Sequence, residues 1–443
     1  MTEANPARMT AATAPRAGYQ TTRTARVTLA MLAFVYVLNF LDRQLISILA
    51  KPIQDALDIS DGQLGLLTGF YFALFYCFIA IPIGWLADRT SRVKVLSAAC
   101  AIWSAATAAC GMAGSYGQLV VARMMVGVGE AGGVPPSYAI ISDSFPRERR
   151  TTAMAIFNLG PPIGSALGVA FGASLAAAFD WRAPFYAIGA IGVVTAVAVF
   201  WLVREPKRGE TDLLPASALA DAGTEGFVAT ILDFFRNPVL RMASLASGAG
   251  NFITYGLLNF TVLFLMREKG MTLGEVAVWY ALVVGIGMSA GIYASGRIVD
   301  RFARRSKTAY ATVPAASLVL ALPFFLGFIW APTWEIALAF LAVPMFLNSF
   351  FLSATVTFVQ SEVAPGRRVI SGALLLLVMN FIGLGLGPTY VGMMSDWFRP
   401  VHGEHALQAA YYALAPMYLI GALLFLRLAR LIGHSMRRDG IPA

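Results

Sequence analysis

Long apolar stretches are the feature of this sequence that most constrains its fold. A sliding window of about 19 residues finds twelve, each long enough to cross a hydrocarbon core of about 30 Å as a helix. Lipid offers the backbone no hydrogen-bond partners, and the stretches lack the alternation of barrel strands, so we expect an all-α integral membrane protein. The predicted spans are 27–51, 63–87, 93–113, 117–141, 151–178, 184–203, 239–266, 275–299, 309–330, 334–358, 368–393 and 405–430.

Charge is scarce and unevenly distributed. Only 13% of the residues are charged, against about 25% in soluble domains. Most of the 33 Lys and Arg residues fall in segments that are inner when the N-terminus is inside. The positive-inside rule then puts both termini in the cytoplasm. The net charge of +9 therefore reflects topology, and we expect no nucleic-acid partner. The predicted outer segments hold Lys51, Arg182, Arg267, Lys269 and Arg399.

An internal repeat divides the chain into two halves. The sequence "GWLADRTSRVK" at 84–94 is echoed by "GRIVDRFARRSK" at 296–307, and Gly160-Pro161 is echoed by Gly387-Pro388. Parallel six-helix halves with a substrate site between them, near the membrane midplane, are one large transporter architecture. The predicted division is a cytoplasmic tail at 1–26, a six-helix half at 27–203, a cytoplasmic linker at 204–238, a six-helix half at 239–430 and a cytoplasmic tail at 431–443.

The first member of this repeat resembles the loop between helices two and three of the major facilitator superfamily. That loop usually reads Gly-x-Leu-Ala-Asp-Arg-x-Gly-Arg-Arg, and Ser91 departs from it where glycine is usual. A glycine allows close helix approach, and the charged residues can hold a cytoplasmic latch. We expect conformational gating from Gly84, Asp88, Arg89, Arg92, Asp300 and Arg301.

The segment from Arg123 to Gly168, together with "LDRQ" in the first span, is similar to the Spinster family of facilitators. The shared motifs are the Asp-Arg of helix one, Arg…Gly-x-Gly-Glu-Ala of helix four and Pro-x-Gly-Ser-x-Leu-Gly of helix five. The resemblance implies a bacterial member in the inner membrane. It also implies a proton-coupled exporter of amphiphiles such as lysophospholipids or sphingosine-1-phosphate.

Four ionisable residues lie deep within the predicted spans, away from the span ends, namely Asp42, Arg43, Arg123 and Glu130. Intramembrane charge costs at least about 2.5–3.5 kcal/mol per residue, which makes each a candidate functional residue. Adjacent helical residues point about 100° apart, so Asp42 and Arg43 each need another partner. A rise of about 1.5 Å per residue puts Asp42 level with Arg123, whereas Glu130 lies deeper and needs a long arginine side chain from Arg43 or Arg123.

These charges predict a switch. Burial favours the protonated form of a carboxylate and a nearby arginine favours the ionised form. Protonation of Asp42 or Glu130 could then free Arg43 or Arg123 to bind an anionic head group. The alternative is a static ion-pair network that fixes helix packing. The proton gradient is the only driving factor that we expect, without a cofactor or metal.

The second half offers polarity without charge in the middle of its spans. Asn251, Tyr255 and Asn259 recur at i, i+4 and i+8 and share one helix face. Interhelical hydrogen bonding is the alternative role for such residues. The predicted substrate-binding residues are Arg43, Arg123, Asn39, Asn251, Tyr255, Asn259 and Asn380.

The sequence therefore predicts a secondary active transporter that works by alternating access. An amphiphilic or anionic small molecule is the expected substrate, with protons and membrane lipids as the other partners, and we expect a monomer. The alternatives are a carrier of small organic anions or drugs with the same fold, and a non-transporting receptor or structural protein. An enzyme is disfavoured because the spans offer no His or Cys cluster and no phosphate loop.

Overall fold

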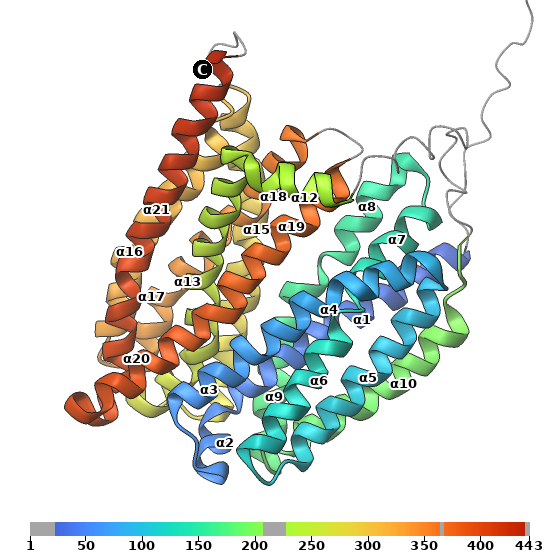
Figure 1. Cartoon of the computed structure of the whole chain (residues 1–443). Coiled ribbons are helices and arrows are strands. Elements are labelled where there is room, and N and C mark those ends of the chain that lie inside the picture. The colour runs from blue at the N-terminus through green and yellow to red at the C-terminus, as the bar shows by residue number, and fades with distance from the viewer. Residues whose placement is uncertain (1–22, 207–226, 364–366, 439–443) are drawn as a thin grey trace, which may run out of the picture.

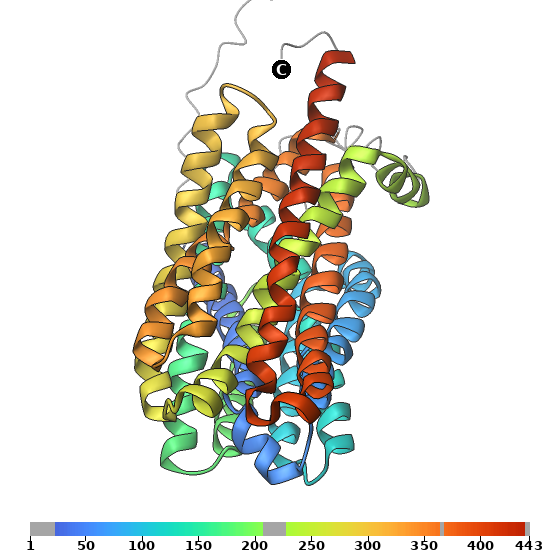
Figure 2. The same cartoon turned by 90° about the vertical axis from the view of Figure 1, so that its left-hand side faces the viewer.

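The computed structural model describes residues 23–206, 227–363 and 367–438, and helices dominate them. The predicted tails and linker lie partly outside these residues. Where they are described, α1 begins at Arg23, α12 (Phe227–Arg236) lies within the predicted linker, and α21 continues past the predicted end of its span to Arg438. Both views show α12 towards the end of the bundle where the C-terminus lies (Figures 1 and 2).

The N-terminal half contains six helical rods, four of which are interrupted. Its helices are α1 (Arg23–Ile48), α2 (Ala50–Leu57), α3 (Asp61–Thr68), α4 (Phe70–Arg89), α5 (Arg92–Met112), α6 (Tyr116–Glu130), α7 (Val134–Ser144), α8 (Arg147–Phe157), α9 (Gly160–Ala178) and α10 (Ala183–Leu202). The break before α9 precedes Gly160-Pro161, where proline lacks the N–H that would continue the hydrogen-bond ladder.

The C-terminal half repeats this arrangement. Its helices are α13 (Pro238–Lys269), α14 (Leu273–Glu275), α15 (Ala281–Ala303), α16 (Ala309–Trp330), α17 (Trp334–Leu347), α18 (Phe350–Glu362), α19 (Arg368–Asn380), α20 (Gly387–His402) and α21 (Ala406–Arg438). Two π-helical turns, Val276–Tyr280 and Phe381–Leu386, join α14 to α15 and α19 to α20. The second turn ends before Gly387-Pro388, so the two Gly-Pro pairs of the repeat both mark a break.

Ten stretches of the described residues are long and apolar enough to span a membrane. One of them, Ile370–Arg437, contains two rods that turn at Gly403. The pair α6 and α7 is absent from the ten because the turn at 131–133 divides it into shorter helices. With these two adjustments the helices correspond to the twelve predicted spans.

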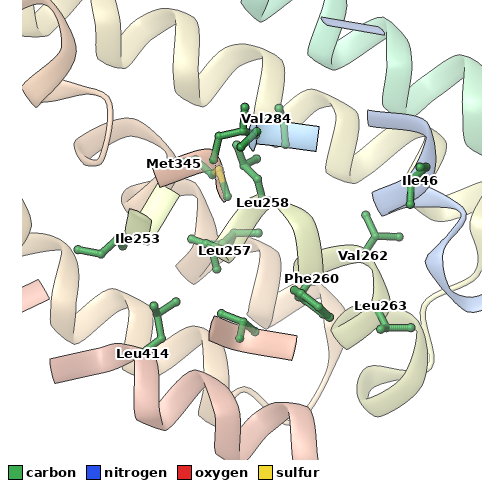
Figure 3. Packing of buried hydrophobic residues seen from close by; sticks show 14 of the residues in the cluster. Ile46, Ile253, Leu257, Leu258, Phe260, Val262, Leu263, Val284, Met345 and Leu414 are labelled. Carbon is green, nitrogen blue, oxygen red and sulfur yellow. The ribbon is translucent and has the colours of Figure 1, made fainter. Parts of the chain in front are cut away.

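The core is centred on α13, the most buried of these candidate spans. Figure 3 shows Ile253, Leu257 and Phe260 of this helix among side chains from several others, including Ile46 of α1 and Leu414 of α21. One buried cluster therefore continues from the second half into the first. This packing fixes α13 beside α1, the helix that carries Asp42 and Arg43.

The two halves meet most closely at one end, where α3 packs along α20 (Figure 1). Lys51, Arg267 and Arg399 lie towards this end, and we call it the outer end after the predicted topology. At the opposite, inner end, ion pairs form within each half. Arg92 pairs with Asp143, and Lys307 pairs with Glu362 at 3.6 Å.

Candidate substrate and proton site

The four intramembrane charges meet between α1 and α6. Nε of Arg43 donates to Oε2 of Glu130 at 2.6 Å, and Nη1 of Arg123 lies 3.4 Å from Oδ2 of Asp42. The depth argument predicted the Asp42–Arg123 pair, and of the two arginines that it left open for Glu130 the structure selects Arg43. All four side chains are buried, and the Glu130 side chain is 0% exposed. The result is a compact network of two acids and two bases inside one half of the protein.

Local structure explains the pairing. Asp42 and Arg43 diverge because they are neighbours on α1, whereas Arg123 and Glu130 lie two turns apart on one face of α6. Gly127 lies between them, and a Cβ at this position would come within 2.9 Å of the Phe72 carbonyl oxygen. The glycine therefore lets α4 lie directly against the charged face of α6.

The network is incompletely satisfied. Asp42 also accepts a hydrogen bond from Oγ1 of Thr107 at 2.9 Å. By contrast, Glu130 Oε1, Arg43 Nη2 and Arg123 Nε have no hydrogen-bond partner among the described residues, and neither does the amide of Asn39. Buried polar atoms without partners are costly, and most proteins avoid them. The site therefore has donors and an acceptor available for a polar ligand or a proton.

Aromatic rings surround the two guanidinium groups. Cζ of Arg43 lies 4.6 Å from the ring centroid of Tyr76 and 4.8 Å from that of Phe40. Cζ of Arg123 lies 4.4 Å from the ring centroid of Phe72. Cation–π contacts of this kind stabilise a desolvated charge. They also place apolar surface directly beside the charged groups.

A small cavity connects this network with the second half. Its volume is about 20 Å³, close to the room that one water molecule needs. Tyr255 and Asn259 reach it from α13, as the sequence predicted for a site between the halves. The remaining lining residues are Phe40, Arg43, Gln44, Thr68, Arg123, Leu258 and Leu384.

The predicted polar residues of the second half have different surroundings. Asn259 accepts a hydrogen bond from Ser47 Oγ of α1 at 2.6 Å. Asn251 donates to the Met379 carbonyl oxygen at 3.1 Å and lies 3.5 Å from Asn380 Oδ1. Interhelical hydrogen bonding, the alternative for these residues, is therefore what this conformation contains for Asn251 and Asn259.

The predicted gating residues lie near the inner end and are not gathered into one cluster. The close approach expected at Gly84 is wrong for this conformation, because a Cβ there would meet no heavy atom within 4 Å. The Arg89 guanidinium carbon lies 4.0 Å from the Trp85 ring centroid. Asp300 and Arg301 are exposed at the end of α15, and the side chain of Asp88 lies outside the described residues.

Arg92 belongs to a contact that the sequence did not indicate. The carboxylate of Glu205 accepts hydrogen bonds from the backbone N–H groups of Arg92 and Val93 and from Ser91 Oγ. A carboxylate at a helix N-terminus is favoured by the helix dipole. The segment that follows α10 therefore secures the start of α5, while the Arg92 side chain pairs with Asp143.

Sequence reasoning also missed Thr107, Phe72 and Tyr76. Thr107 is one turn from Trp103 on α5, and a lone threonine in an apolar helix usually bonds to its own backbone. The aromatic residues are common in apolar spans, so their type alone gave no signal. What could have identified them is the rule that a buried arginine needs neighbours on more than one helix.

The comparisons with known proteins agree with this architecture. Residues 32–374 match the family described as the Major Facilitator Superfamily. The chain belongs to the Major Facilitator Superfamily. An "MFS-type efflux pump" of Mycolicibacterium smegmatis is 32% identical over 410 residues, covering 91% of this chain and 92% of that protein.

Spinster proteins are also homologous to this superfamily member. "Protein spinster homolog 1" of Bos taurus is 26% identical over 424 residues, covering 89% of this chain and 78% of that protein. The crystal structure of a bacterial homolog to the human lysosomal transporter Spinster, inward-facing and unoccupied, superposes with a TM-score of 0.82. It is 28% identical and covers 94% of this chain and 98% of that one. The chain is therefore a multi-pass membrane transporter with an alternating-access fold, and its homologues are transporters rather than enzymes.

Proposed function

We propose that this protein couples proton movement to the export of an amphiphile with an anionic or zwitterionic head group, such as a lysophospholipid or sphingosine-1-phosphate. The observation that carries the proposal is the buried network of Asp42, Arg43, Arg123 and Glu130, in which both arginines and Glu130 keep an unpaired polar atom. Such a network can exchange partners without unfolding.

Proton coupling rests on the two carboxylates. When Glu130 is ionised, it holds Arg43 by a charge-assisted hydrogen bond. When Glu130 is protonated, the charge that holds the guanidinium is lost, and Arg43 is available to an anionic ligand. Asp42 stands in the same relation to Arg123 at a longer distance. Proton binding and substrate binding would then be linked through the same arginine, which is the requirement for coupling one to the other.

The substrate class rests on the surroundings of the arginines. A phosphate or carboxylate head group fits paired guanidinium groups, and the rings of Phe40, Phe72 and Tyr76 provide apolar surface for a hydrocarbon tail. The relative of known structure is named as a homolog of a lysosomal transporter, which supports transport as the role of this chain. The cavity of about 20 Å³ is too small for a lipid, so the halves must separate further to admit one.

The same proposal includes orientation and gating. We place both termini in the cytoplasm of a bacterium, with the protein in its inner membrane as a monomer, and the structure then corresponds to a state closed at the outside. Gly84, Asp88, Arg89, Arg92, Asp300 and Arg301 would act at the inner end, where Gly84 and Gly296 face open space. They would approach one another when the inner end closes.

A second candidate is export of small organic anions or drugs through the same site. It is favoured by the relative named as an efflux pump, which shares the highest identity among the relatives described above. The substrates of the two candidate functions share a head group that the arginines can bind, and they differ in whether they carry a long hydrocarbon tail. A direct comparison of substrates in one preparation therefore separates them.

The test is transport in proteoliposomes under an imposed pH gradient. A labelled lysophospholipid would be followed by the fraction that serum albumin can no longer extract from the outer leaflet. Wild type would be compared with Asp42→Asn and Glu130→Gln, with Asp55→Asn as the matched control. Asp55 makes an exposed pair with Lys51 within α2, outside the network.

We expect gradient-driven flux in wild type and Asp55→Asn, and its loss in the two network variants while substrate still binds. A protonophore should abolish the wild-type signal. Normal gradient-driven flux in both network variants would refute the coupling role. Flux of a small organic anion without flux of lysophospholipid would instead favour the second candidate.

A further inference from the structure

The exposed stripe of α21 changes from apolar to basic along its length. Ile420 and Leu423 are 44% and 64% exposed, and Arg427, Arg430 and His434 are exposed further along the helix. Steps of three and four residues keep all five side chains on one helix face. The helix therefore presents apolar surface near its middle and a column of basic side chains towards the inner end.

This stripe faces away from the rest of the protein. α21 packs against α13, α16 and α20, and Phe425, Leu428 and Ile432 are among its buried side chains. The helix forms one edge of the bundle in Figure 1 and lies towards the viewer in Figure 2. The basic column therefore borders the surrounding membrane and the water beyond it.

The basic side chains line a hollow on this face, which we call the α21 hollow. Its volume is about 440 Å³, within the size range of ligand sites. Leucines line one end of it and cations line the other. The lining residues are Leu423, Leu426, Arg427, Arg430, Leu431 and His434. This lining suits a molecule with an anionic group joined to a hydrocarbon chain.

The protein does not balance these cations. The residues of α21 include no Asp or Glu, and within the described part of the chain Arg427 and Arg430 have no ion-pair partner. Other cations at the inner end do have one. Lys307 pairs with Glu362 at 3.6 Å, and Arg367 pairs with Asp233 at 2.9 Å. The positive charge of the α21 hollow is therefore available to an anion from outside the protein.

Depth in the membrane indicates which anion this is. A rise of about 1.5 Å per residue puts Arg427 about 6 Å and Arg430 about 10 Å inward of Leu423. The head-group layer on each side of the hydrocarbon core is about 5–7 Å thick, so the two arginines reach it while Leu423 stays among the acyl chains. Basic pockets at this level bind anionic lipid head groups.

From these observations we propose that the α21 hollow binds an anionic phospholipid of the leaflet at the inner end. Arg427 and Arg430 bind its phosphate with their planar guanidinium forks, and His434 donates to the polar head group beyond. Leu423 and Leu426 pack along an acyl chain. The proposal is independent of the transported substrate and of proton coupling, because the central network lies inside the other half.

Binding of this kind has a measurable consequence. A lipid that binds only the folded protein raises its unfolding temperature in proportion to its occupancy. Because the phosphate and the acyl chain both contribute, the intact lipid should bind much more tightly than inorganic phosphate. A zwitterionic lipid with the same chains should also bind more weakly, because its choline group repels the column of cations.

The test is a lipid titration of the delipidated full chain in detergent, followed by native mass spectrometry and by thermal unfolding. The ligands are dioleoyl phosphatidylglycerol, dioleoyl phosphatidylcholine and sodium phosphate. Wild type would be compared with Arg427→Gln, Arg430→Gln and the double variant. The matched control is Arg304→Gln with Arg305→Gln, which removes two exposed cations at the same end, outside the hollow.

We expect phosphatidylglycerol to bind wild type and the control with the same affinity. Each single variant should weaken binding about fivefold and the double variant about thirtyfold, with a matching loss of the thermal shift. Unchanged affinity in the double variant, or an equal loss in the control, would overturn the proposal. Inorganic phosphate that stabilises the protein as well as the lipid does would also overturn it, because the site would then bind a soluble anion.

Discussion

Two charged clusters of this protein differ in where their partners lie. The central network consists of Asp42, Arg43, Arg123 and Glu130. The cluster at the outer end, which we call the outer clasp, consists of Ser60, Asp61, Arg267, Ser395 and Asp396. In the central network all four charges belong to the N-terminal half, and several polar atoms have no partner. In the outer clasp the carboxylates of Asp61 and Asp396 are bound across the two halves. The Asp61 carboxylate receives donors on both oxygens.

This difference separates two tasks of a transporter. A network inside one half can change its protonation while the halves stay still. A cluster that crosses the boundary changes only when the halves move. We therefore propose that ligand and proton exchange involve the first cluster, whereas the second holds the two halves together at the outer end. Four substitutions test this contrast, and they are described below in order of decreasing expected effect.

The largest effect is expected for Arg43→Ala. It leaves the Glu130 carboxylate, 0% exposed, without its partner, and breaking a buried pair in this way costs about 3–5 kcal/mol. Lys51→Ala breaks an exposed pair and should cost about 0–1 kcal/mol. Thermal unfolding in one detergent measures both variants. Equal losses would show that the central network does not depend on the Arg43–Glu130 pair.

The next effect is expected for Thr107→Val. The hydroxyl donates to Asp42 Oδ1 at 2.9 Å, and hydrogen bonds to charged groups contribute about 1.5–3 kcal/mol. We expect loss of stability in that range, with Thr107→Ser closer to wild type because it keeps the hydroxyl. Denaturation of the two variants in parallel provides the measurement. A Val variant as stable as the Ser variant would remove Thr107 from the network.

A somewhat smaller effect is expected from Gly65→Ala. The new Cβ would approach the Pro388 carbonyl oxygen, and overpacking costs about 1–3 kcal/mol. Because the closed outer end bears this cost, the outer-open population should rise. The distance between spin labels at exposed Ala56 and Val401 measures this population. Gly433→Ala at the inner end of α21, where a Cβ would meet no heavy atom within 4 Å, is the matched control and should leave the outer-open population unchanged. The contrast between the ends fails if both variants behave alike.

The smallest effect is expected for Ser47→Ala. Its hydroxyl donates to Asn259 Oδ1 at 2.6 Å across the halves, and a neutral interhelical hydrogen bond in a membrane contributes about 0.6 kcal/mol. The outer-open population should rise only slightly, far less than for Asp61→Asn. A shift as large as that of Asp61→Asn would mean that neutral contacts at the centre hold the halves as strongly as the outer clasp does.

Much of the central network could be predicted from the sequence. Asp42, Arg43, Arg123 and Glu130 are conspicuous because charge is rare in the middle of a span. Regular helix geometry gave their relative depths and the Asp42–Arg123 pair, but it did not decide which arginine pairs with Glu130. The side chains around them could not be predicted in the same way. Phe72, Tyr76 and Thr107 are ordinary residues of apolar helices, and only the packing of α4 and α5 against α1 and α6 brings them to the charges.

The sequence by itself determined the helical membrane fold, the twofold repeat and the four central charges, because hydropathy, periodicity and depth are properties of neighbouring residues. Only the tertiary structure decided that Asp61 and Arg267 form a pair. They are 206 residues apart and lie near helix ends, where charged residues are common and carry no signal of burial. Their partnership arises when two separately folded halves close at the outer end, and that contact is a property of the assembled protein.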